Sequence, residues 1–169
     1  VLILTDQDKD GLHIKGLLMN MFACYWEPLL EEGFLITMYT PIVKVRKGNK
    51  VVKVFYNQND YEQWKDTNSL KGLTIKYYKG LGTSSDQEAK EYFKNMKKVT
   101  YMYDENADEV IDLAFNKKRA DDRKLWLQNY NKDNVLDYSK LNVDYKSFVD
   151  KDLIHFSNRD LQRSINHIC

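Results

Sequence analysis

The feature that most constrains the fold is an acidic turn between a short apolar run and a longer helical pattern. Residues 1–5 are apolar enough for a buried strand, and residues 12–26 repeat apolar side chains at helical spacing. Between them, Asp6, Asp8 and Asp10 occupy alternate positions. A strand, a polar turn and a packed helix form the opening of an α/β unit. We therefore expect an α/β fold whose first strand is central in its sheet and carries the turn at its carboxyl end.

Three carboxylates in one tight turn repel one another unless a cation neutralises them. Oxygen-only ligands of this kind suit Mg²⁺, with Mn²⁺ or Ca²⁺ as alternatives. A capping role at the start of the helix explains one aspartate without a metal, and the others would then be solvated. Asp6, Asp8 and Asp10 are the predicted metal ligands, and the spacing leaves open whether Asp10 binds the ion directly.

Three classes of protein use aspartates at such spacing. An EF-hand loop starting at Asp6 requires a glutamate where Leu17 stands, and a helix rather than a strand before it. An aspartate-nucleophile phosphatase would use Asp6 and Asp8 but normally has a threonine where Asp10 stands, so that class stays open. The third class is Toprim, whose D-x-D-x-x-G pattern is satisfied by Asp6, Asp8 and Gly11.

Further strands and helices are predicted along the chain. Ser85 and Glu88 have the spacing of a helix-capping box. We expect the first helix to bury an apolar stripe, namely Ile14, Leu17, Leu18, Met21, Phe22 and Tyr25, with Trp26 packed beside it. We expect strands at residues 34–46 (interrupted by Pro41), 51–56 and 73–78, and helices at residues 60–65, 86–98, 105–115 and 120–128. Residues 129–144 are polar and predict a linker, and residues 145–154 predict a short helix or strand.

Composition excludes several functional classes. The formal net charge is only +1, so nucleic-acid binding would depend on local clusters of basic residues. The two cysteines give neither metal-ligand spacing nor a disulfide framework, which fits a reducing compartment. No apolar run approaches the roughly 20 residues of a membrane span. We expect a protein that is neither secreted nor membrane-bound, and an internal segment of a longer chain.

Four ordered blocks resemble the type IIA DNA topoisomerases, in particular eukaryotic or viral DNA topoisomerase II. Residues 4–18 (LTDQDKDGLHIKGLL) resemble the Toprim segment, and residues 76–84 (KYYKGLGTS) with 88–93 (EAKEYF) resemble the later Toprim motif. Residues 113–118 (LAFNKK) with 121–124 (DDRK) resemble the segment that follows, and residues 156–158 (FSN) with 163–165 (RSI) resemble the start of the winged-helix domain. Lys9, Leu12 and the residues after Ile165 depart from the family pattern without touching the carboxylates.

The resemblance implies a Toprim-like, small, parallel-rich sheet flanked by helices, with a mostly helical C-terminal extension. Residues 1–128 would be the C-terminal part of the Toprim domain with a following helical segment. Residues 129–144 would be the polar linker, and residues 145–169 the truncated start of the winged-helix breakage-reunion domain.

The resemblance also implies an activity. The intact enzyme, a homodimer, cuts both strands of one DNA duplex, passes a second duplex through the break with ATP, and reseals it. Asp6, Asp8 and Asp10 would hold Mg²⁺, while ATP would not bind this segment. The family's glutamate ligand is expected before Val1 and its nucleophilic tyrosine beyond Cys169, so we expect no catalytic residue in the chain and no activity from the chain alone. The enzyme would work in the nucleus of a eukaryote, or in the host cell or virion of a virus.

Basic residues beside these motifs are the expected contacts to double-stranded DNA: Lys76, Lys79, Lys117, Lys118, His13 and Lys15. The alternative for residues 117–119 is that their charged side chains are simply solvated and do not contact DNA. Two other readings of the whole chain are a different Toprim enzyme, such as a primase or nuclease, and a Toprim-derived binding module without chemistry.

Overall fold

The computed structural model describes residues 1–168, apart from the side chains of Leu81, His167 and Ile168. Its main sheet has four strands in the order β1-β2-β6-β7, with β1 parallel to β2, β2 antiparallel to β6, and β6 parallel to β7. The strands are β1 (Leu2–Ile3), β2 (Ile36–Met38), β6 (Lys98–Met102) and β7 (Asn142–Asp144). Two of the three pairings are parallel, as the α/β prediction requires. Within the described residues, however, β1 pairs only with β2, which corrects the expectation of a central first strand.

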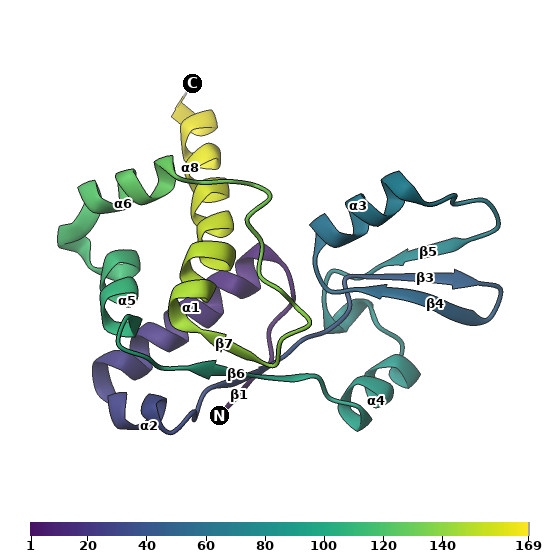
Figure 1. The fold of residues 1–169 in the computed structure, drawn as a ribbon, viewed down its shortest axis with the longest axis horizontal. Helices are drawn as coiled ribbons and strands as arrows, with labels where there is room; N and C mark the ends of the chain where they lie inside the picture. The colour runs from purple at the N-terminus through teal and green to yellow at the C-terminus, as the bar shows by residue number, and fades with distance from the viewer. Residues whose placement is uncertain (169) are drawn as a thin grey trace.

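Helices gather around this sheet (Figure 1). They are α1 (Lys9–Tyr25), α2 (Glu27–Glu31), α5 (Ala107–Phe115), α6 (Ala120–Gln128), α7 (Tyr145–Phe148) and α8 (Ile154–Ile168), with a π-helical turn, Val149–Leu153, between the last two. Helix α1 contacts α5, α8 and the π-helical turn. The core between these elements includes Ile3, Met19, Leu35, Val99, Tyr101, Ile111, Tyr145, Phe148 and Leu153. In the described residues we find no helix with the length and apolar character that a bilayer crossing requires.

Helix α1 buries Phe22 and partly buries Leu18 as predicted, but the rest of its buried stripe differs from the predicted one. Leu12, Lys15, Met19 and Phe22 face the core, whereas the side chains of Ile14, Leu17, Met21, Tyr25 and Trp26 are exposed. Both stripes have helical spacing, so periodicity could not choose between them. The choice follows from the neighbours of the helix: Gly16 lies against Phe115 of α5 and Leu153 of the π-helical turn, which places those elements on its own face.

A second, antiparallel sheet forms a separate lobe, shown beside α3 in Figure 1. It has the order β4-β3-β5, with β3 (Val43–Lys47), β4 (Lys50–Phe55) and β5 (Thr74–Tyr77), and α3 (Gln58–Thr67) packs on it. Val43, Val45, Phe55 and Tyr61 form its core. The predicted break at Pro41 is the point where the chain leaves the main sheet and starts the second one.

Helix α4 (Asp86–Lys94) begins with the predicted capping box: Ser85 accepts from the Glu88 N–H, and Glu88 accepts from the Ser85 N–H. It ends four residues before the predicted boundary at 98, and the chain then forms β6, which we did not predict. Helix α6 has the predicted bounds.

The segment predicted as a polar linker is packed into the fold. Leu136 and Tyr138 are buried in the main core, and residues 142–144 pair with β6 as strand β7. Most side chains of this segment face solvent, which explains its polar composition. A few spaced apolar residues attach it to the core. The domain boundaries drawn from this linker stay a prediction.

Candidate metal-binding turn and DNA-contact residues

The acidic turn is closed by the start of helix α1. Asp8 is the N-cap residue, and its Oδ1 accepts a hydrogen bond from the Gly11 N–H at 2.8 Å. A Cβ at position 11 would lie 1.9 Å from the carbonyl oxygen of Asp6. The glycine of the D-x-D-x-x-G pattern is therefore required because the backbone of the first aspartate passes directly against it.

The glycine-rich loop lies against Asp6. A Cβ at Gly80 would be 1.8 Å from Asp6 Oδ1, so the loop backbone packs directly on this carboxylate. Thr83 holds the loop, since its hydroxyl donates to the Gly80 carbonyl at 2.8 Å and accepts from the Lys79 N–H at 3.1 Å. Two motifs that are far apart in the sequence thus meet at one carboxylate, and Lys79 is exposed beside them.

Asp10 has another partner. It lies in the first turn of α1 and forms an ion pair with Arg159 of α8. The described residues contain no group of three His, Cys, Asp or Glu side chains placed to hold one metal ion. The expected gathering of all three aspartates is therefore not seen in this part of the chain, and their metal-ligand role stays a prediction.

Asp6 and Asp8 nevertheless fit a Mg²⁺ ion. Both are exposed carboxylates at the end of β1. Mg²⁺ is commonly bound through one or two carboxylates, with waters and substrate phosphates completing its shell. Asp8 also borders a groove of about 830 Å³, whose wall includes several cationic side chains, namely Lys9, Lys79, Lys132, Lys151 and Arg159. The turn thus borders a groove whose cationic side chains suit a phosphate, although Glu62, Asp133 and Asp152 line it too.

Lys15 and His13 are placed differently from the expected phosphate contacts. The Lys15 side chain is buried, and its Nζ donates to Gln7 Oε1 at 3.2 Å. Burial lowers the pKa of Lys15 to about 8, against the opposing effect of the Asp152 and Asp8 charges. His13 stacks on Phe156, with ring centroids 4.0 Å apart. The structure therefore gives Lys15 an internal partner in place of the predicted DNA contact.

Lys76 reaches an acidic centre that we did not predict as a site. Glu88 is buried, and it receives hydrogen bonds from Lys76 at 2.8 Å, from the Ser85 N–H at 3.0 Å and from the Tyr78 hydroxyl. Buried Lys44 and half-buried Arg46 complete the ring of partners. Burial would raise the pKa of Glu88, but the bonds from Lys76, Tyr78 and Ser85 hold it well below its ordinary value. Sequence showed only the capping role of Glu88.

Lys117 and Lys118 lie on a short 3₁₀ turn, Lys117–Arg119, between α5 and α6. Asn116 caps it by accepting from the Lys118 N–H at 2.9 Å. Both lysine side chains are exposed, whereas Arg119 forms ion pairs with Glu109, Asp112 and Asp122. Residues 117–119 thus comprise two exposed lysines and one arginine whose ion pairs join α5 to α6.

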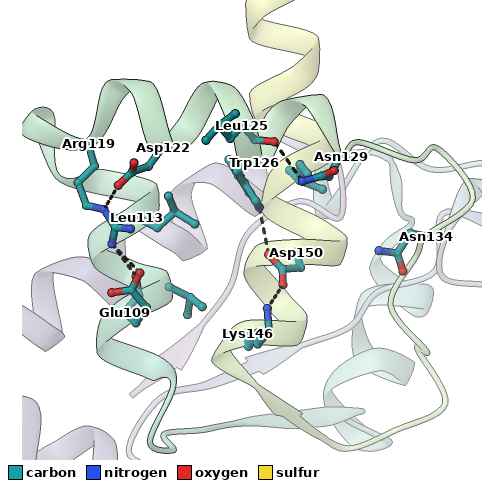
Figure 2. A pocket seen from close by; sticks show the side chains of 12 residues that line it. Glu109, Leu113, Arg119, Asp122, Leu125, Trp126, Asn129, Asn134, Lys146 and Asp150 are labelled. Carbon is teal, nitrogen blue, oxygen red and sulfur yellow. Dashed lines mark hydrogen bonds and ion pairs between the residues drawn. The ribbon is translucent and has the colours of Figure 1, made fainter.

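Beside this turn, α5, α6 and the α7 region enclose a pocket of about 600 Å³ (Figure 2). Its apolar lining includes Val110, Leu113, Leu125 and Ile154. Figure 2 shows that Arg119 pairs with Glu109 and Asp122 in this pocket. Asp150 pairs with Lys146 and accepts a hydrogen bond from the Trp126 N–H. These pairs satisfy the charges that the pocket displays.

Comparison with known families agrees with this architecture. The family model for the C-terminal associated domain of TOPRIM (TOPRIM_C) matches residues 38–161. The chain belongs to the TOPRIM_C family. The match covers the second lobe, the glycine-rich loop, Glu88 and the basic turn, whereas the acidic turn and helices α1 and α2 precede it.

Relatives of this TOPRIM_C chain confirm the resemblance to DNA topoisomerase II. It is 50% identical to DNA topoisomerase 2 of Arabidopsis thaliana over 98% of its length, and 48% identical to DNA topoisomerase 2 of Plasmodium falciparum over 99%. It spans 12% of the length of each of these relatives. A crystal structure of the Plasmodium falciparum topoisomerase II DNA-binding, cleavage and re-ligation domain matches 96% of the chain and 23% of that domain, with a TM-score of 0.88 and 48% identity.

Proposed function

We propose that this chain is part of the cleavage and re-ligation region of a type II DNA topoisomerase that breaks one duplex, passes a second through it with ATP and reseals it. The observation that carries the proposal is the contact between Asp6 of the acidic turn and Gly80 of the glycine-rich loop, inside a chain 48% identical to a domain of that name. The substrate would be double-stranded DNA, the assembly a homodimer, and the compartment the nucleus of a eukaryotic cell.

Each set of residues has a separate task in this proposal. Asp6 and Asp8 would hold Mg²⁺, with Asp10 as a further candidate when it leaves Arg159. Bound there, the ion would stabilise charge on the scissile phosphate and the leaving oxygen. Gly80 lets the loop backbone close on Asp6, and Lys79, exposed in the same loop, would contact the reacting phosphate. Lys117 and Lys118 would bind the DNA backbone, with Lys76 and His13 as weaker candidates because each already has a partner.

Replacing Asp8 in the complete enzyme tests the metal role. We expect Asp8→Asn to keep DNA binding and fold stability, because asparagine caps helices as well as aspartate does. DNA cleavage should fall, because a lost carboxylate weakens the ion that acts in the transition state. A Mg²⁺ titration of cleavage, run beside DNA binding, measures both effects.

Asp144→Asn is the matched control. Asp144 is also an N-cap aspartate, accepting from the Ser147 N–H at 2.7 Å, but it caps α7 instead of the helix that begins at the acidic turn. Its replacement should leave cleavage unchanged. Normal cleavage by Asp8→Asn at limiting Mg²⁺ would remove the metal role and favour a binding module without chemistry.

A further inference from the structure

A buried charged cluster lies beneath the acidic turn. Lys15 belongs to the core-facing stripe of α1, where its neighbours Leu12 and Met19 are apolar. Its Nζ donates to Gln7 Oε1 at 3.2 Å, and Gln7 stands between Asp6 and Asp8. The ammonium of a core lysine is therefore bonded to the middle of the turn that carries the predicted metal ligands.

Asp152 is a second buried charged residue of this cluster, and its negative charge acts to raise the pKa of Lys15. It lies in the π-helical turn before α8, is buried, and accepts from the Tyr138 hydroxyl at 2.8 Å. Burial raises the pKa of Asp152 to about 6, while the Tyr138 bond and the Lys15 charge oppose that rise. Since the pKa of Lys15 is about 8, both groups are charged at neutral pH.

Burying two charged side chains in a core carries a large desolvation cost. Taking two charges out of water costs several kcal/mol for each ion, and well-packed apolar residues of similar volume often serve stability equally well. A π-helical turn is also a rare, irregular element that frequently occurs at functional sites. The cluster therefore points to a role beyond packing, and its contact with the acidic turn indicates which one.

We propose that Lys15 is a positioning residue for the acidic turn: from its buried place on α1, its bond to Gln7 fixes the turn between Asp6 and Asp8. The turn would then be ordered before any metal binds. The Asp10–Arg159 ion pair adds a surface link between the same turn and α8. The consequence for metal binding rests on the function proposed above, whereas the ordering of the turn does not.

Amide hydrogen exchange of the complete enzyme in EDTA tests the ordering without metal. Gln7→Leu removes the bond to Lys15 and leaves both buried charged residues, Lys15 and Asp152, in place. Lys15→Met with Asp152→Asn removes both charges together, so that neither is left buried and unpaired. In each variant we expect exchange of residues 6–11 to accelerate by roughly tenfold, the effect of losing one hydrogen bond to a charged donor. Exchange in β3 and β4 should not change.

Lys97→Met is the matched control. Lys97 donates to the Tyr138 carbonyl at 2.6 Å, so it is bonded to the same segment without touching the turn, and its loss should leave residues 6–11 as in the wild type. Wild-type exchange of residues 6–11 in Gln7→Leu would overturn the proposal, even if the double variant failed to fold.

A Mg²⁺ titration of DNA cleavage with Gln7→Leu separates positioning from general support of the fold. We expect the Mg²⁺ concentration for half-maximal cleavage to rise several-fold, with the maximum recovered at high Mg²⁺. An unchanged midpoint, in an assay where Asp8→Asn shifts it, would overturn the positioning role. If Asp8→Asn also had no effect, the proposed function would fail, and the exchange result would still decide whether Lys15 orders the turn.

Discussion

At the scale of single residues, the acidic turn depends on close backbone approaches that only glycine allows. Gly11 lies against the Asp6 carbonyl, and Gly80 lies against the Asp6 carboxylate. Gly82, two residues further along the same loop, has no atom within 4 Å of the position of a Cβ. The lack of a side chain is therefore required at Gly80, where the loop meets Asp6, and is not required at Gly82.

We predict that Gly80→Ala displaces the Asp6 carboxylate and reduces Mg²⁺-dependent DNA cleavage in the complete enzyme. The new methyl group has no space, and such overpacking typically costs about 1–3 kcal/mol of stability. Gly82→Ala should change neither cleavage nor stability. Cleavage assays and chemical denaturation of both variants check this, and equal behaviour of the two would show that the contact with Asp6 does not matter.

Glu88 is the second residue on which many contacts converge. We predict that Glu88→Gln destabilises the chain at pH 7 by on the order of 3 kcal/mol, because it leaves the buried Lys44 with only the exposed Glu91 carboxylate, 3.8 Å away, as an ion-pair partner. The folded-state pKa of Glu88 is depressed, so its contribution is present above the ordinary glutamate pKa and is lost as the pH falls below it. The stability difference between wild type and variant should therefore begin to shrink below about pH 5 and continue to shrink as the pH falls toward the depressed folded-state pKa. A stability difference that stayed constant over that range would contradict the assignment.

At the scale of elements, the 3₁₀ turn between α5 and α6 combines two functions in three consecutive residues. Asn116 caps it, Arg119 fixes it to acidic side chains on both neighbouring helices, and the two lysines remain exposed. Rigid attachment of this kind holds exposed cations in place for a phosphate backbone.

We predict that Lys117→Ala with Lys118→Ala weakens DNA binding by the complete enzyme for all sequences and lowers the salt slope by about one unit per lost phosphate contact. Thermal stability should not change. Arg119→Ala, the matched control, should instead lower the melting temperature, because it removes the ion pairs that join α5 and α6. Binding isotherms at several salt concentrations test this, and unchanged binding by the double variant would leave the lysines as a solvated surface.

At the scale of the whole molecule, residues 129–144 close the fold. This polar stretch crosses from α6 to β7 and places Leu136 and Tyr138 in the core of the main sheet. Tyr138 also bonds Asp152, so the same stretch supports the cluster beneath the acidic turn.

We predict that Leu136→Ala lowers the free energy of unfolding by about 2–5 kcal/mol, as is typical of a cavity in a packed core. Leu141→Ala, in the same stretch, should change it by less than about 0.5 kcal/mol, because Leu141 is 54% exposed. Urea denaturation measures both, and equal small effects would mean that the stretch is a detached linker after all.

The sequence by itself determined the features that depend on neighbouring residues. The strand–turn–helix opening, the Ser85–Glu88 capping box, the bounds of α6 and the glycine at position 11 all follow from local spacing, since their partners lie within a few residues. Only the tertiary structure decided which stripe of α1 is buried, because Ile14–Leu17–Met21 and Leu12–Lys15–Met19 have the same period. It likewise decided that Lys15 is buried with its Nζ bonded to Gln7, and that Glu88 pairs with cations from β3 and β5. Those contacts join residues far apart in the chain, and a buried charge is recognisable only when its long-range partner is known.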